Sequence, residues 1–209
     1  MKVCGLTDPD DARDAVDIGA DMIGMIFARS KRKVSVEQAR EIVFACRPAI
    51  TVGVFVNSEP DEINEIMDQT GIAMVQLHGD EPPEYLPKIN RPCIKVFRIY
   101  DTASVVAIST WFAHLDTKRP TSILLDTYDP KDRGGTGRIF NWDLVAHANH
   151  GGELSKLAPI ILSGGLNPDN VAEGIEKIGP WGVDVSSGVE FAPGCKDLNL
   201  LEKFIDEVF

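Results

Sequence analysis

Two side chains through which enzymes commonly transfer protons stand where apolar runs of this sequence end. Cys4 closes the first run, KVC, and Asp126 closes the run SILLD. Cysteine is also a small hydrophobic residue that is often found in protein cores. Position alone therefore leaves two interpretations of Cys4, as a reactive group or as a core residue.

Two turns rich in glycine and serine could hold an anion. The turn SGGLNP (163–168) contains Gly164 and Gly165 and leads toward an expected helix start, and Ser186 and Ser187 stand in the next turn, SSG. Glycine lets the backbone approach a ligand closely, and the N–H groups at a helix start favour negative charge. A tight turn would also explain the glycines, but two such turns in succession favour a phosphate site.

Three other polar segments each allow a functional and a purely structural interpretation. The basic run RSKRK (29–33) is either a solvated face or the source of an arginine that binds a carboxylate at two points. His78 either lines a site or is a structural histidine. The stretch GGTG (134–137) lacks the spacing of a nucleotide-binding loop, which leaves a mobile lid or a plain loop.

Eight short apolar runs, each followed by a segment of helical periodicity, organise the chain. The runs are rich in β-branched residues and almost continuously apolar, as strands of a parallel sheet covered on both faces are. Eight β–α units in 209 residues predict an α/β fold, a single (β/α)₈ TIM barrel that occupies residues 1–209 as one domain. The expected strands are residues 2–4, 22–27, 51–56, 73–77, 93–98, 122–126, 159–163 and 182–186.

Capping residues predict where the helices begin. Ser, Asp and Asn accept hydrogen bonds from the first N–H groups of a helix, and Pro suits its first turn. Expected helix starts are Asp8, Ser35, the segment SEPD (58–61), Glu81, Asn141, Asn167 and Asp197. A barrel of this kind carries its active site at the carboxyl ends of the strands, so the polar residues at those ends should converge.

Composition narrows the function classes. With 21 Lys and Arg against 32 Asp and Glu, the net charge of −11 argues against a general nucleic-acid surface. No apolar run is long enough to span a bilayer, and the N-terminal residues lack the apolar core of a secretion signal. The four cysteines form no CxxC pair, which argues against a zinc site or a disulfide framework and favours a reducing cytoplasm.

Specific motifs occur in a familiar order along the chain. They are KVCGLT, GMIFARSKRKVS, VGVFVN, VQLHGDE, ILLDT, GGTGRIFNW, ILSGGLNPDNV and GVDVSSGVE-x₃-G-x-KD. With this set, which covers essentially the whole chain, the sequence resembles the phosphoribosylanthranilate isomerases of tryptophan biosynthesis. The resemblance implies a (β/α)₈ barrel without metal or organic cofactor, a small-molecule substrate, and a monomer or homodimer. The implied reaction is the Amadori rearrangement of N-(5-phosphoribosyl)anthranilate to 1-(2-carboxyphenylamino)-1-deoxyribulose 5-phosphate.

The same resemblance implies a role for each matching residue. Cys4 corresponds to the general base, Asp126 to the general acid, and Arg32 to the residue that binds the anthranilate carboxylate. The backbones of the two glycine- and serine-rich turns correspond to the phosphate site, and His78 and Asp184 to positions that line the substrate site. The chemistry agrees, because opening the furanose needs an acid with a raised pKa, and a thiolate can remove the C2 proton if its surroundings lower its pKa. The phosphate-site residues are Gly164, Gly165, Ser186 and Ser187.

Two departures and two alternatives accompany this interpretation. Lys31 stands where many family members carry Pro, and Ser163 where Ala is common. One alternative is another barrel isomerase of a phosphosugar, which would need no pair of Cys4 and Asp126. The other is a phosphosugar-binding barrel without activity, in which an acid and a base at strand ends would serve no purpose.

Overall fold

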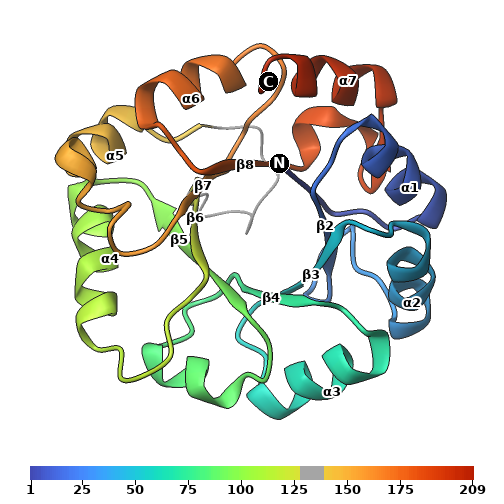
Figure 1. Cartoon of the computed structure of the whole chain (residues 1–209), viewed down its shortest axis with the longest axis horizontal. Coiled ribbons are helices and arrows are strands. Elements are labelled where there is room, and N and C mark those ends of the chain that lie inside the picture. Colours follow the sequence, from blue (N-terminus) through green and yellow to red (C-terminus); the bar gives the residue numbers. More distant parts are fainter. Residues whose placement is uncertain (128–138) are drawn as a thin grey trace.

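Eight parallel strands close into a barrel in this computed structural model, which describes residues 1–127 and 139–209 (Figure 1). Each strand pairs with the next along the chain, and β8 pairs with β1 to complete the ring. The predicted (β/α)₈ barrel is therefore confirmed. The strands are β1 (Lys2–Cys4), β2 (Met22–Ile26), β3 (Ile50–Phe55), β4 (Met74–Leu77), β5 (Cys93–Ile99), β6 (Ser122–Thr127), β7 (Ile160–Leu162) and β8 (Gly182–Val185).

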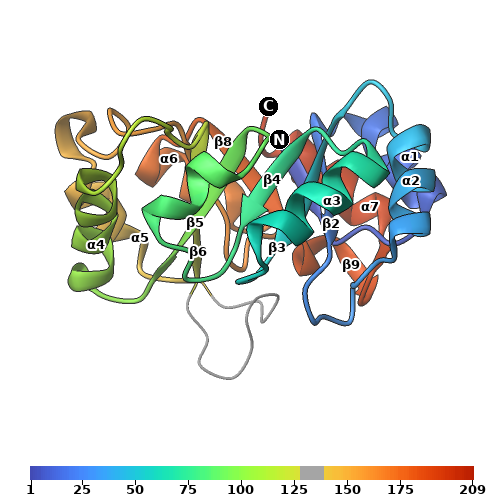
Figure 2. The same cartoon turned by 90° about the horizontal axis from the view of Figure 1, so that it is seen from below.

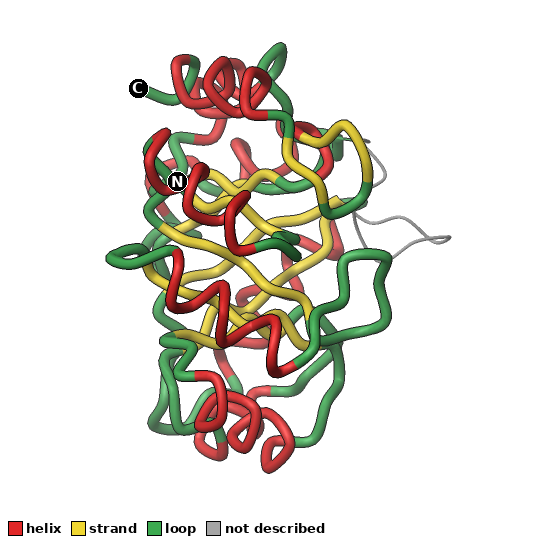
Figure 3. Tube along the Cα trace, turned by 90° about the vertical axis from the view of Figure 1, so that its right-hand side faces the viewer, coloured by secondary structure: helices red, strands yellow, loops and turns green. Residues whose placement is uncertain are grey.

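Helices cover the outside of the barrel and connect successive strands (Figures 1 and 3). They shield the outer face of the sheet, which explains why the strands are apolar on both faces. No helix of the described part of the chain is long and apolar enough to cross a membrane. The α-helices are α1 (Pro9–Ile18), α2 (Val36–Ala45), α3 (Pro60–Thr70), α4 (Thr102–Ala113), α5 (Trp142–Ala148), α6 (Val171–Ile178) and α7 (Leu198–Asp206).

Local capping chemistry fixes most helix starts. Asp8 and Asp197 each accept two backbone N–H groups, and Ser35 forms a reciprocal capping box with Gln38. Asn141 caps α5 through its side-chain oxygen. These four predicted starts are confirmed, and each strand–helix turn is thereby held at a defined residue.

Two predicted helix starts are wrong. The helix expected from Glu81 is a short 3₁₀ helix, η1 (Pro83–Lys88), because three prolines in the segment remove backbone donors. The helix expected from Asn167 begins three or four residues later, at Val171 with Asn170 as N-cap. In the preceding turn the Asn170 side chain instead accepts the Asn167 N–H, and the Asn167 side chain accepts the Asp169 N–H, each at 2.9 Å.

Apolar side chains form two layers. A small cluster fills the inside of the barrel, and a larger one lies between the strands and the helices. The inner cluster comprises Met22, Val52, Ile94, Val96, Leu124 and Ile161. Above it, the inward positions toward the carboxyl ends of the strands are polar, so the barrel has an apolar floor and a polar mouth.

A small hairpin follows β8 and was not expected from the sequence. It consists of the antiparallel strands β9 (Glu190–Ala192) and β10 (Cys195–Lys196), preceded by a 3₁₀ turn, η3 (Ser187–Val189). Figure 2 shows β9 on the face of the barrel opposite the two chain ends. That face carries the carboxyl ends of the strands, where the candidate site residues lie.

Candidate active site

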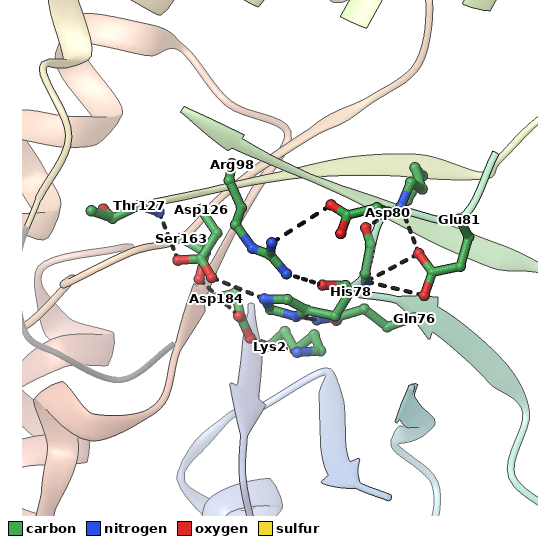
Figure 4. Close-up of polar contacts among 12 residues, drawn as sticks. Lys2, Gln76, His78, Asp80, Glu81, Arg98, Asp126, Thr127, Ser163 and Asp184 are labelled. Atoms are coloured by element: carbon green, nitrogen blue, oxygen red, sulfur yellow. Dashed lines mark hydrogen bonds and ion pairs between the residues drawn. The ribbon is translucent and has the colours of Figure 1, made fainter. Parts of the chain in front are cut away.

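A hydrogen-bonded chain of three side chains connects β4 to β6. Gln76 Nε2 lies 2.9 Å from His78 Nδ1, and His78 Nε2 lies 3.0 Å from Asp126 Oδ2 (Figure 4). Because the Gln76 amide donates to Nδ1, the imidazole carries its proton on Nε2 and donates it to Asp126. The other carboxylate oxygen of Asp126 accepts the Thr127 N–H at 2.8 Å. Two predicted site residues, His78 and Asp126, therefore meet directly.

The loop that carries His78 is fixed from below by a buried ion pair. Glu81 accepts the N–H groups of Asn57 and Gly79 and binds the Lys95 ammonium at 2.7 Å, with both charged side chains almost fully buried. Arg98 donates to the His78 carbonyl at 2.6 Å from the opposite side. A histidine at the mouth of the barrel is thus held by backbone contacts as well as by its ring.

Gly79 explains why this loop can lie so close to its neighbour. A Cβ at that position would stand 2.2 Å from Asn57 Oδ1 and 2.7 Å from Glu81 Oε1. Any side chain there would push the loop away from Asn57, which also accepts the Asp80 N–H at 2.7 Å. The glycine of the motif HGDE therefore serves packing rather than ligand binding.

Cys4 lies at the carboxyl end of β1 with 6% of its surface exposed. Its neighbour on β2 is Gly24, where a Cβ would stand 2.7 Å from the Cys4 sulfur. Burial raises the pKa of the Cys4 thiol, while the charges of Lys2 and Lys196 lower it in part. The surroundings therefore do not lower the pKa of this thiol overall, contrary to what its role as a base would require.

Beside Cys4, three polar side chains are linked by hydrogen bonds inside the barrel, with the Asp184 carboxylate between the other two. The Lys2 ammonium donates to Asp184 Oδ1 at 2.7 Å, and the Ser163 hydroxyl donates to Asp184 Oδ2 at 2.9 Å (Figure 4). Lys2 and Asp184 are 1% and 5% exposed. The pKa of Lys2 is raised, because the Asp184 carboxylate and Cys4 together outweigh the effect of burial. Asp184, predicted to line the substrate site, is thus held by Lys2 and Ser163.

Arg32 lies in the loop after β2 and is bound to the hairpin after β8. Its Nε and Nη2 contact both carboxylate oxygens of Glu190, at 2.7 to 3.0 Å. Glu190 also accepts the Lys196 ammonium at 2.8 Å, and Lys196 donates to the Cys4 carbonyl at 2.7 Å. Burial alone would raise the pKa of Glu190, but the hydrogen bonds and charges of Arg32 and Lys196 lower it overall.

The two predicted phosphate turns adjoin these groups. Gly164 and Gly165 have φ values of 86° and 72°, which other residues adopt only with strain. A Cβ at Gly164 would stand 2.4 Å from Thr127 Oγ1 and 3.0 Å from Asp126 Oδ1, so this turn abuts the end of β6. Ser186 borders η3, which Ser187 begins, and the Ser186 hydroxyl shares a tight space with Arg32, because a Cβ at Gly5 would contact both.

The sequence predicted most residues of this site, but not the buried charged and amide side chains that hold them in place. The predicted residues Cys4, Asp126, His78, Asp184 and Arg32 all lie toward the carboxyl ends of the strands, as do the two turns. The stretch GGTG (134–137) lies outside the described residues. Within the described ranges, no group of three or more His, Cys, Asp or Glu side chains could hold a metal ion. The supporting residues that were not named are Lys2, Gln76, Glu81, Lys95, Glu190 and Lys196.

A family model, related sequences and solved structures all match this chain to one enzyme family. The family described as N-(5'phosphoribosyl)anthranilate (PRA) isomerase matches residues 1–207. The N-(5'-phosphoribosyl)anthranilate isomerase of Geobacter sulfurreducens is 45% identical over 207 residues, which are 98% of this chain and 96% of that protein.

Solved structures agree with the sequence match. The crystal structure of phosphoribosyl anthranilate isomerase from Thermotoga maritima superposes with a TM-score of 0.87 at 37% identity, covering 99% of this chain and 96% of the other. A phosphoribosyl anthranilate isomerase in complex with reduced 1-(o-carboxyphenylamino)-1-deoxyribulose 5-phosphate gives a TM-score of 0.83 at 36% identity, with the same coverage. With its barrel, its motifs and its relatives in agreement, the chain belongs to the N-(5'-phosphoribosyl)anthranilate isomerase family.

Proposed function

We propose that Cys4 is the general base and Asp126 the general acid with which this chain isomerises N-(5-phosphoribosyl)anthranilate. The observation that carries the proposal is the direct contact of His78 with Asp126 at the mouth of the barrel, at 3.0 Å. Cys4 ends β1 at the same mouth, and β6, which carries Asp126, lies three strands away around the closed ring. An acid and a base on separate strands can approach one bound sugar from two sides.

The proposed reaction proceeds in two proton transfers. Asp126 first donates a proton to the ring oxygen of the furanose, while the nitrogen lone pair forms a double bond to C1 and the C1–O bond breaks. The Cys4 thiolate then removes the proton from C2, and the electron pair of that C–H bond forms the enolamine. In the tautomerisation C1 gains a proton and the C2 hydroxyl loses one, which gives the ketone without any external oxidant or reductant.

The substrate-binding residues follow from the same arrangement. We assign the anthranilate carboxylate to Arg32, which Glu190 orients, and the phosphate to backbone N–H groups of the glycine- and serine-rich turns after β7 and β8. His78 orients Asp126, and Asp184 lines the site beside Cys4. The related structure with a bound reduced product analogue supports a small-molecule site of this kind. A catalytic thiol also favours a reducing cytoplasm.

Two isosteric substitutions test the roles of the acid and the base. Cys4→Ser and Asp126→Asn should each lower kcat by about 10²–10⁴-fold while KM and the thermal midpoint stay near the parent values. The assay follows the loss of phosphoribosylanthranilate fluorescence. Cys46→Ser is the matched control, since Cys46 is a fully buried cysteine that caps α2 and should cost stability but leave kcat intact. A folded Cys4→Ser protein with parental kcat would refute the proposed base.

A further inference from the structure

Lys2 is a buried charge for which the proposed reaction has no use. It lies inside the barrel with 1% of its surface exposed, on the same inward face of β1 as Cys4, because side chains two residues apart in a strand share a face. Its register partner on β2 is Met22, a member of the apolar inner cluster. An ammonium group in such a place needs a reason.

Stability alone does not supply that reason. Replacing a buried ion pair by apolar residues of similar size is often neutral or even stabilising, so the pair of Lys2 and Asp184 adds little as a structural device. The barrel is also closed around it by backbone hydrogen bonds between β1 and both neighbouring strands. The position of the pair, beside the proposed base, is the more informative feature.

The groups around Cys4 are unequal in charge. Lys2 interacts with the thiol as well as with Asp184, and Lys196 approaches from the hairpin after β8, where it donates to the Cys4 carbonyl. Each ammonium already has a carboxylate partner, Asp184 for Lys2 and Glu190 for Lys196. Of the described charged groups that act on the thiol itself, Lys2 and Lys196 are cations and Asp184 is an anion, and Lys2 has the largest effect of the three.

We propose that Lys2 is a positioning residue that stabilises the thiolate form of Cys4, with Asp184 as the competing anion that limits this effect. The inference rests on the proposed role of Cys4 as base. In the resting protein the Lys2 ammonium is bound mainly to Asp184. When the Cys4 thiol releases its proton to water, the same ammonium stabilises the new charge, and the C2 proton taken from the substrate restores the thiol.

Two opposite substitutions test the inference on the free protein. Iodoacetamide alkylation of Cys4 is measured as a function of pH by mass spectrometry of the peptide that contains it, because only the thiolate reacts. Lys2→Met should raise the midpoint of alkylation by about 1–3 pH units, which is the effect of losing a nearby opposite charge. At a fixed pH below both midpoints, alkylation should therefore be about 10–1000-fold slower. Asp184→Asn should do the reverse and accelerate alkylation.

The internal control is Cys195, which is partly exposed and should be alkylated at the same rate in the parent and in every variant. The double variant Lys2→Met with Asp184→Asn leaves no unpaired buried charge, so it serves if either single variant fails to fold. Its midpoint should lie above that of the parent, because Lys2 affects the thiol more strongly than Asp184 does. A purely structural pair would move both single variants in the same direction or not at all.

The outcomes separate the two proposals. If the midpoint stays unchanged in Lys2→Met, or if Lys2→Met and Asp184→Asn shift it in the same direction, the inference about Lys2 is wrong. If Cys4→Ser is active, the proposed base is wrong, whatever alkylation shows. If Cys4 is the base and Lys2 stabilises its thiolate, the fall of kcat/KM on the acid side of the pH profile should move to higher pH in Lys2→Met, together with the alkylation midpoint.

Discussion

Gly24→Ala should separate the position of Cys4 from the stability of the barrel. A Cβ at Gly24 would stand 2.7 Å from the Cys4 sulfur and 3.1 Å from its Cα. Carbon atoms in contact prefer roughly 3.5–4.0 Å, so the sulfur must move by about 1 Å. The strand cannot retreat as a whole, because β1 is paired on both sides and Lys196 binds the Cys4 carbonyl.

The size of both effects follows from this displacement. Overpacking a core position costs about 1–3 kcal/mol, which lowers the thermal midpoint of a chain of this length by roughly 2–12 °C. A shift of about 1 Å in a reacting group costs on the order of 10²-fold in rate. Gly24→Ala should therefore lower kcat about 100-fold, with a smaller change in KM, when product formation is followed by substrate fluorescence.

Gly53→Ala is the matched control. Gly53 lies on the neighbouring strand β3, and a Cβ there would stand 2.9 Å from Phe55 Cε2 and 3.3 Å from Met67 Sδ, on the outer face that packs against α3. The same type of clash should therefore cost similar stability with parental kcat. If Gly24→Ala and Gly53→Ala lose similar stability and keep the same kcat, the position of Cys4 does not limit turnover and its assignment as base is wrong.

Three further substitutions address the remaining contacts. Arg32→Ala should raise KM roughly 10–150-fold with little change in kcat, as expected for a lost charged hydrogen bond of about 1.5–3 kcal/mol, and an unchanged KM would place the substrate carboxylate elsewhere. Gln76→Leu removes the donor to His78 and should lower kcat by roughly 2–10-fold at constant KM, whereas a parental kcat would show that the imidazole needs no such partner. Glu190 has a lowered pKa in the folded protein, so its contribution to stability is present above the ordinary glutamate pKa of about 4.3 and is lost as the pH falls below it. Glu190→Gln should thus be less stable than the parent at pH 7 and lose less stability in acid; equal acid sensitivity of the two thermal midpoints would contradict the pairing with Arg32 and Lys196.

Local signals made most of the fold predictable. The strands are short β-branched runs, and four of the predicted helix starts are residues whose side chains cap the helix, so these elements could be found from their own few residues. Where the local signal was ambiguous, the prediction was wrong. Proline after Glu81 suggested a helix start, but three prolines and the burial of Glu81 against Lys95 leave only a 3₁₀ turn.

The support of the site depends on contacts between distant residues and was therefore harder to predict. Lys2 and Asp184 are 182 residues apart, and only the closure of the ring brings them to 2.7 Å. Some signal was nevertheless present in the spacing of these residues. Lys2 stands two residues before Cys4 in β1, and Gln76 of β4 stands two residues before His78, which follows the strand. Side chains two residues apart in a strand point to the same face. A charged or amide side chain two residues before a proposed catalytic residue therefore points into the barrel together with that residue.

The pairing of the first strand with the last also determines when the surroundings of Cys4 form during synthesis of the chain. Cys4 leaves the ribosome early, whereas Asp184 follows Lys2 by 182 residues and Lys196 follows Cys4 by 192. Contacts between such distant residues form late, after the intervening units have been made. A nascent chain that lacks β8 and the hairpin after it therefore carries Cys4 and Lys2 without Asp184 and Lys196, and an unpaired edge on β1. Docking of β8 removes the open edge and brings Asp184 to Lys2, and the hairpin then brings Lys196 to the Cys4 carbonyl.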